Sequence, residues 1–154
     1  MELIEHFIDG KKYSGSSKKK SKVFNPATGE QTAEVKLAST EDTNKAIESS
    51  KKAFTKWSNT PPLQRARVMF KFKDLIEKNS DELTKIIVSE HGKVYDDAKG
   101  SLTRGLEVVE FACGIPQMLK GEFTENVGTN VDSWSIRQPL GVCAGITPFN
   151  FPAM

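Results

Sequence analysis

The sequence predicts an α/β fold in which short β-ribbons, a run of helices, a second ribbon and one buried strand follow one another. Three observations support this prediction. Residues 1–38 alternate between apolar and polar positions, residues 39–119 repeat apolar side chains at helical spacing, and residues 140–146 form a run of small and apolar residues without a charge. Alternation is typical of a half-exposed strand, spacing of three and four residues is typical of a helix, and an uncharged run is typical of a strand covered on both faces.

The composition is that of a globular protein with balanced charge. The 154 residues are 37% hydrophobic and 27% charged, and 22 basic against 20 acidic residues leave a formal net charge of +2. This balance gives no electrostatic reason to bind nucleic acid or a membrane, so we expect neither partner. Charged residues interrupt the first ten positions, so we expect no signal peptide, a cytoplasmic location, and free, buried thiols at Cys113 and Cys143. The two histidines, His6 and His91, stand at no ligand spacing from the cysteines, so we expect no metal site.

The first 38 residues are expected to form β-ribbons around two turns. Asp9-Gly10 between alternating segments is a strong signal for a two-residue hairpin. The stretch from Asn25 to Gly29 indicates a second turn, in which Gly29 takes up the left-handed conformation.

Four helices are expected between residues 39 and 119. Their predicted starts are a cap at Ser39 or Thr40, the pair Pro61–Pro62, Ser80, and about Asp96. Gly92 is expected to end the third helix, and Cys113 lies at the end of the fourth. The predicted inward positions are Leu83, Ile86 and Ile87 on the third helix, and Ala98, Leu102, Leu106, Val109 and Cys113 on the fourth.

Residues 120–138 are polar and extended, which indicates two strands of a ribbon. The apolar run Leu140–Ile146 is then expected to be a buried strand of a parallel sheet, at whose carboxyl edge ligands bind. Pro148 and Pro152 each restrict the residue before them, so Asn150 is held on a short, stiff turn at that edge. A fixed amide donor is suited to stabilising an oxyanion, although Asn150 could instead cap the turn or a helix that begins at Pro152.

The segment ITPFNFPAM, at residues 146–154, resembles the motif that aldehyde dehydrogenases carry after the first strand of their nucleotide-binding domain. NPATGE, AFTKW, EHGK and RGLEVVEFACGIPQMLKGE follow the order and spacing of the same family, so the resemblance covers residues 3–154. Phe149, where most relatives have Trp, and the run RQPLGVCAGITPFNFPAM are similar to the methylmalonate-semialdehyde dehydrogenases, the CoA-acylating branch.

This resemblance implies roles for five residues. Asn150 matches the amide of the oxyanion hole, and Ile146, Thr147 and Phe149 match the stretch that lines the NAD pocket, largely through its backbone. Arg104 matches the arginine that recognises the carboxylate of the substrate, a task suited to the two parallel hydrogen bonds of a guanidinium.

From the residues alone, Arg104 has another interpretation. A lone arginine on a helix more often forms a surface ion pair, here with Glu107 or Glu110. The glycines on either side, Gly100 and Gly105, leave little steric bulk around it, which suits a binding role.

The resemblance further implies a division of the chain and an activity. Residues 1–38 would be N-terminal ribbons, 39–119 the helical part of the NAD-binding domain, 120–138 an oligomerisation ribbon, and 139–154 the first strand and turn of the NAD-binding sheet. The implied enzyme is a homo-oligomer, a tetramer in full-length form, that oxidises an acidic semialdehyde with NAD and passes the acyl group from a cysteine thioester to coenzyme A, without a metal. Relatives in the mitochondrial matrix make that compartment the alternative location.

The chain itself is expected to be the N-terminal part of such an enzyme and to be inactive alone. Neither Cys113 nor Cys143 matches the nucleophile of the family, whose position lies beyond Met154. Two alternatives remain open: a short non-catalytic protein that binds to full-length subunits, and an aldehyde dehydrogenase that hydrolyses its thioester. We expect the isolated chain to aggregate, dimerise or require other chains, because its apolar strand would lack neighbours.

Overall fold

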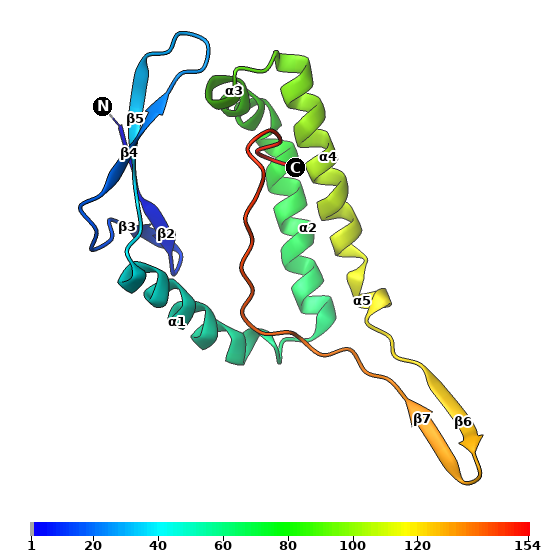
Figure 1. Ribbon diagram of the computed structural model, residues 1–154. Coiled ribbons are helices and arrows are strands. Elements are labelled where there is room, and N and C mark those ends of the chain that lie inside the picture. The colour runs from blue at the N-terminus through cyan, green and yellow to red at the C-terminus, as the bar shows by residue number, and fades with distance from the viewer. Residues whose placement is uncertain (1) are drawn as a thin grey trace.

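A computed structural model describes residues 2–154 and confirms the α/β class, with strands before and after a helical middle (Figure 1). The strands are β1 (Glu2–Ile4), β2 (His6–Ile8), β3 (Lys11–Tyr13), β4 (Lys20–Phe24), β5 (Gln31–Lys36), β6 (Phe123–Gly128) and β7 (Val131–Trp134). The helices are α1 (Thr40–Trp57), α2 (Pro62–Lys78), α3 (Ser80–His91), α4 (Tyr95–Cys113) and the single turn α5 (Ile115–Met118).

Two small sheets form the N-terminal part. In one, β5 lies between β1, to which it is parallel, and β4, to which it is antiparallel; β2 and β3 form a separate hairpin. Asp9 and Gly10 at its turn have φ of 56° and 73°, as a two-residue hairpin loop requires. Gly29 has φ of 74°, and its N–H donates to the Asn25 carbonyl oxygen at 2.8 Å. Both predicted turns are therefore confirmed.

A capping box begins α1. The Asp42 N–H donates to the Ser39 hydroxyl at 3.1 Å, and the Ser39 N–H donates to the Asp42 carboxylate at 2.8 Å. Asp42 is only 1% exposed and also accepts hydrogen bonds from the Ser16 N–H and the Tyr13 hydroxyl. The Ser39 hydroxyl also donates to this carboxylate, at 2.8 Å. Donation from the Ser39 N–H, and then from the Ser16 N–H and the Ser39 and Tyr13 hydroxyls, holds the pKa of the Asp42 carboxyl well below its usual range, against the opposing effect of burial. This carboxylate ties the β2–β3 hairpin to the start of α1.

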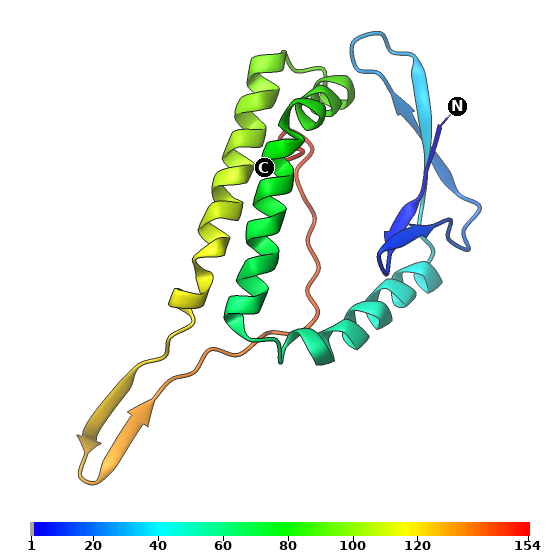
Figure 2. The same cartoon turned by 180° about the vertical axis from the view of Figure 1, so that it is seen from behind.

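The core of the molecule lies among α2, α3 and α4, which pack side by side (Figures 1 and 2). Its buried residues are Ile87, Ala98 and Leu102, and Ile76, Leu83 and Val88 pack against them. Gly92, with φ of 79°, ends α3 as expected. The prediction that Ile86 faces inward is wrong, because successive residues of a helix point about 100° apart and the buried position is taken by Ile87.

The strands β6 and β7 form a hairpin that projects away from the helices (Figures 1 and 2), which confirms a two-stranded ribbon within residues 120–138. Every residue of both strands is exposed. At the base of the hairpin the Ser135 N–H donates to the Glu122 carbonyl oxygen, and the Glu122 N–H donates to the Ser135 hydroxyl. The ribbon therefore closes on itself at this base.

Residues 140–146 do not form the predicted buried strand. They belong to an irregular segment that runs from β7 past the end of α1 to the helices (orange to red in Figure 1). Leu140 is 96% exposed and Ile146 is fully exposed. A strand requires a hydrogen-bonded neighbour, and no strand within residues 2–154 pairs with this segment. Its apolar side chains consequently face solvent.

Candidate functional site

The C-terminal turn meets α4 around Arg104. Phe151 lines a hollow of about 260 Å³ together with Arg104, Ser101 and Lys93, and the Lys93 ammonium lies 4.5 Å from the centre of the Phe151 ring. That distance is within the range of a cation–π contact. The hollow thus joins three separate stretches of the chain: the residues before α4, α4 itself, and the turn that carries Asn150.

The absence of a side chain at Gly105 allows the C-terminal turn to pack closely against α4. A Cβ atom at Gly105 would lie 2.9 Å from the carbonyl oxygen of Ala153, which is nearer than real Cβ contacts come. The same atom at Gly100 would meet nothing within 4 Å. Gly105 therefore lets the backbone of residues 153–154 rest against α4, one residue after Arg104.

Arg104 is exposed and forms none of the ion pairs that its alternative interpretation requires. Within residues 2–154, neither Glu107 nor Glu110 lies within ion-pair distance of its guanidinium; Glu110 instead pairs with Lys73 at 3.5 Å. The hollow also has two carboxylates at its border, Asp96 and Asp97. Arg104 consequently keeps its hydrogen-bond donors available in a hollow whose total charge is balanced.

Sequence reasoning did not identify the other residues of this hollow. Ser101 lies three residues before Arg104, so helical spacing alone places the two on neighbouring parts of the α4 surface. Phe151 follows Asn150 directly, yet only the folded turn places it beside α4. No sequence pattern identified Lys93 as a residue of this hollow, because its position depends on the conformation of the loop between α3 and α4.

The predicted cofactor residues lie outside that hollow. Ile146, Thr147, Phe149 and Asn150 are all exposed, and none of them lines the hollow beside Arg104. Among the described residues, the backbone of residues 136–148 forms no backbone–backbone hydrogen bond, and its Gly141 carbonyl oxygen accepts only from the Cys143 thiol, at 3.7 Å. Its other N–H and C=O groups remain available. Free backbone groups of this kind can bind a ligand.

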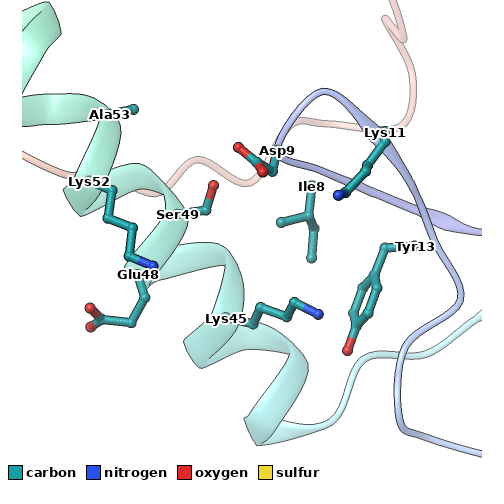
Figure 3. A pocket seen from close by; sticks show the side chains of 9 residues that line it. All are labelled: Ile8, Asp9, Lys11, Tyr13, Lys45, Glu48, Ser49, Lys52 and Ala53. Carbon is teal, nitrogen blue, oxygen red and sulfur yellow. The ribbon is translucent and has the colours of Figure 1, made fainter.

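A second hollow, of about 360 Å³, lies between the β2–β3 hairpin and α1 (Figure 3). Lys11, Lys45 and Tyr13 border it, and the Lys45 ammonium stands 4.0 Å from the centre of the Tyr13 ring. The hydrogen bond to Asp42, together with burial, raises the pKa of the Tyr13 hydroxyl. The hollow contains none of the predicted site residues, and its contacts hold the hairpin against the helix.

The two cysteines differ from each other. Cys113 is buried at the end of α4, as expected, but Cys143 is exposed, so the prediction of two buried thiols is wrong for Cys143. The reason is the same as for the missing strand: no described residue covers both faces of residues 140–146.

Comparison with known proteins identifies the family. The sequence model of the aldehyde dehydrogenase family matches residues 13–154. The chain belongs to that family. This confirms the family resemblance and the assignment of the fold to the N-terminal part of aldehyde dehydrogenase structures.

The similar proteins include semialdehyde dehydrogenases. Malonate-semialdehyde dehydrogenase of Pseudomonas aeruginosa is 49% identical over 154 residues, which are 100% of this chain and 31% of the relative. The mitochondrial, acylating methylmalonate-semialdehyde dehydrogenase of Arabidopsis thaliana is 48% identical over 151 residues, covering 98% of this chain and 25% of the relative. The chain therefore spans less than a third of the length of these aldehyde dehydrogenases.

Solved structures give the same result. A Sinorhizobium meliloti protein described as a methylmalonate-semialdehyde dehydrogenase, solved in complex with NAD, matches with a TM-score of 0.95 and 54% identity. The enzyme of that name from Oceanimonas doudoroffii matches with a TM-score of 0.95 and 53% identity. Each match covers 100% of this chain and 31% of the solved chain.

The helices of residues 2–154 include no candidate for a membrane-spanning segment, since none combines sufficient length with sufficient hydropathy.

Proposed function

We propose that this chain forms part of an NAD-dependent, CoA-acylating dehydrogenase that oxidises malonate semialdehyde or methylmalonate semialdehyde. The observation that carries this proposal is the contact between the C-terminal turn and α4 around Arg104. Arg104, a cation without an ion-pair partner within residues 2–154, shares its hollow with Phe151, the neighbour of Asn150. The printed names of the most similar relatives support the same substrate class, and the name of the plant relative includes acylation.

In this proposal, two side chains hold the two ends of the substrate. The Arg104 guanidinium donates two parallel hydrogen bonds to the carboxylate, and the Asn150 amide donates to the aldehyde oxygen as negative charge develops on it. A cysteine thiolate outside residues 1–154 would attack the carbonyl carbon, and loss of hydride to NAD would convert this adduct to a thioester. The thiol of coenzyme A would then take the acyl group, and the cysteine would leave as the thiolate.

The cofactor proposal rests on residues 146–149. Their free backbone groups and the exposed Ile146 and Phe149 side chains would form one wall of the NAD site. NAD, when bound, accepts the hydride of the aldehyde. This chain would position the cofactor and exclude water there, while other parts of the enzyme complete the pocket.

The domain division is proposed on the same basis. Residues 140–146 would become a strand of the NAD-binding sheet once neighbouring strands of the enzyme pair with them, because they form no backbone–backbone hydrogen bond within residues 2–154 and carry no charged side chain. The β6–β7 hairpin, exposed along its whole length, would form subunit contacts in a homo-oligomer.

A second candidate is a non-catalytic chain that binds to full-length subunits. The exposure of Leu140, Ile146 and Phe149, each above 90%, favours it, since these side chains need a covering surface. The intact mass of the protein purified from its source separates the two. A mass several times 17.1 kDa supports the dehydrogenase, and a mass near 17.1 kDa supports the binding protein.

The experiment that tests the proposed activity is a substrate comparison on the complete enzyme. We expect Arg104→Ala to lower kcat/KM for malonate semialdehyde about 100-fold, the effect of losing a charged hydrogen-bonding partner, and to change kcat/KM for a neutral aldehyde little. Arg67→Ala is the matched control, because Arg67 is also exposed on a helix but lies outside the hollow. Equal losses for both substrates would remove Arg104 from carboxylate recognition.

Two further measurements complete this test. Asn150→Ala should lower kcat by about 10²- to 10³-fold, the usual effect of removing one oxyanion donor. Omitting coenzyme A separates acyl transfer from hydrolysis: turnover that continues unchanged without it would support the hydrolytic alternative.

A further inference from the structure

The Ser101 hydroxyl is buried and has no hydrogen-bond partner. Ser101 lies on the inner side of α4, is 5% exposed, and its Oγ neither donates nor accepts a hydrogen bond within the described part of the chain. A buried polar group without a partner is unfavourable, so such groups are rare in folded proteins. Its occurrence here requires an explanation.

Several other hydroxyls on the helices of this chain do have partners. Thr103 on the same helix donates to the Lys99 carbonyl oxygen at 3.0 Å, and Ser50 on α1 donates to the Ala46 carbonyl oxygen at the same distance. Thr84, which is fully buried, donates to the Ser80 carbonyl oxygen at 2.7 Å. Burial within a helix therefore does not prevent this bond to the preceding turn. The buried Ser101 hydroxyl differs from these in having no hydrogen-bond partner within the described residues.

The position of Ser101 indicates what could use this hydroxyl. Ser101 lines the same hollow as Arg104, one helical turn earlier on α4. Its Oγ has almost no solvent-accessible surface, so a ligand in the hollow reaches the hydroxyl only after the side chain changes rotamer. A carboxylate has about four acceptor positions, and a guanidinium fork occupies two of them. A carboxylate held by Arg104 therefore retains acceptor positions for a neighbouring hydroxyl.

The charges around the hollow make such a directional donor important. Lys93 and Arg104 are balanced by Asp96 and Asp97, all of which line the hollow. A balanced site does not concentrate anions by charge alone. Selection of an acid must then depend on hydrogen bonds with defined direction.

We propose that the Ser101 hydroxyl donates a hydrogen bond to the carboxylate of the bound semialdehyde, beside Arg104, and so contributes to the preference for acidic substrates. This inference rests on the proposed function of Arg104. It explains the free hydroxyl as a donor that finds its partner only when substrate binds. Ser101 is then a specificity residue at the end of the substrate remote from the reacting carbonyl.

The test compares Ser101→Ala and Ser101→Thr in the complete enzyme. For Ser101→Ala we expect KM for malonate semialdehyde to rise about 10-fold, the effect of losing one hydrogen bond to a charged group, with kcat changed by less than about 2-fold. Kinetics with a neutral aldehyde should stay unchanged. Ser101→Thr, which keeps the hydroxyl, should restore most of the affinity.

Two readouts do not depend on turnover. Malonate, which carries the same carboxylate group, should bind to the Ser101→Ala enzyme about 10-fold more weakly by titration calorimetry. The melting temperature of Ser101→Ala should be equal to or above that of the wild type, because the variant removes an unpaired buried hydroxyl. Thr84→Val is the matched control: it removes a paired buried hydroxyl, so it should lower the melting temperature and leave malonate binding unchanged.

The outcomes separate the two proposals. An enzyme that binds malonate through Ser101 but does not oxidise acidic semialdehydes overturns the proposed function and keeps only the hydrogen bond from Ser101 to a bound carboxylate. An active enzyme in which Ser101→Ala melts earlier, with malonate binding unchanged, overturns the inference and makes Ser101 a structural residue. Equal increases in KM for acidic and neutral aldehydes also overturn it, since they would show that Ser101 only shapes the hollow.

Discussion

The helical body, formed by α2, α3 and α4, and the terminal segment, residues 136–150, contain the same kinds of apolar side chain in opposite environments. Leu102 in the helical body is 7% exposed, whereas Leu140 in the terminal segment is 96% exposed. The helices supply apolar surfaces to one another, but no strand within residues 2–154 pairs with the terminal segment. An apolar run thus indicates that a partner is needed, without saying which part of the protein supplies it.

The largest expected effect comes from making the same substitution in both regions. Leu102→Ala should lower the free energy of unfolding by about 2–5 kcal/mol, because it leaves a cavity among packed helices. Leu140→Ala in this chain should change it by less than about 0.5 kcal/mol, as substitutions at exposed sites do. Urea denaturation followed by circular dichroism measures both.

The same pair tests the proposed sheet. In the complete enzyme, Leu140→Ala should become destabilising to a degree similar to Leu102→Ala, since the proposed strand would then be covered. If Leu140→Ala remains neutral there, residues 140–146 are not a buried strand.

A smaller effect is expected at the carboxylate that joins the hairpin to α1. The pKa of Asp42 is lowered in the folded state, so its contribution to stability is complete above the ordinary aspartate pKa of 3.8. That contribution is lost as the pH falls below 3.8 toward the lowered value. Asp42→Asn should therefore lower the melting temperature at neutral pH and weaken the dependence of stability on acid pH. Asp74→Asn, an exposed aspartate without an ion pair within residues 2–154, is the control and should leave both unchanged.

The smallest effects distinguish two glycines of α4. Gly100→Ala should raise the free energy of unfolding by about 1 kcal/mol, because alanine favours the helix and meets nothing within 4 Å. Gly105→Ala should gain less or even lose stability, since its Cβ would press on the Ala153 carbonyl oxygen at 2.9 Å. Proteolytic cleavage of the turn at residues 148–154 should become faster only in Gly105→Ala. Equal stabilisation by both variants would show that residues 153–154 do not rest on α4.

Features fixed by local chemistry could be predicted from the sequence. Asp9-Gly10, the Ser39 cap and the Gly92 stop each depend on a few neighbouring residues, and all three are present. The parallel pairing of β1 with β5 has no local signal, because it joins segments distant in the chain. The predicted strand at residues 140–146 is not formed within residues 2–154 for the same physical reason, since pairing depends on a second segment.

The candidate site shows the same division. The residue types of Arg104 and Asn150, together with their family motifs, identified them as candidates, and their roles stay predictions. Ser101 could not be found in this way, because an unpaired hydroxyl is defined by what surrounds it. Only the folded structure shows that its helical neighbour Thr103 has a partner and Ser101 has none.

The two cysteines differ in exposure, so their rates of chemical labelling report on two different regions of the molecule. Cys143 is exposed in the terminal segment, whereas Cys113 is buried at the end of α4 in the helical body. An alkylating reagent should modify Cys143 first and reach Cys113 only after the helices open. During assembly of the complete enzyme, the decrease in Cys143 labelling with time would show when other parts of the enzyme cover residues 140–146. Cys113 provides the internal reference for chains that never folded.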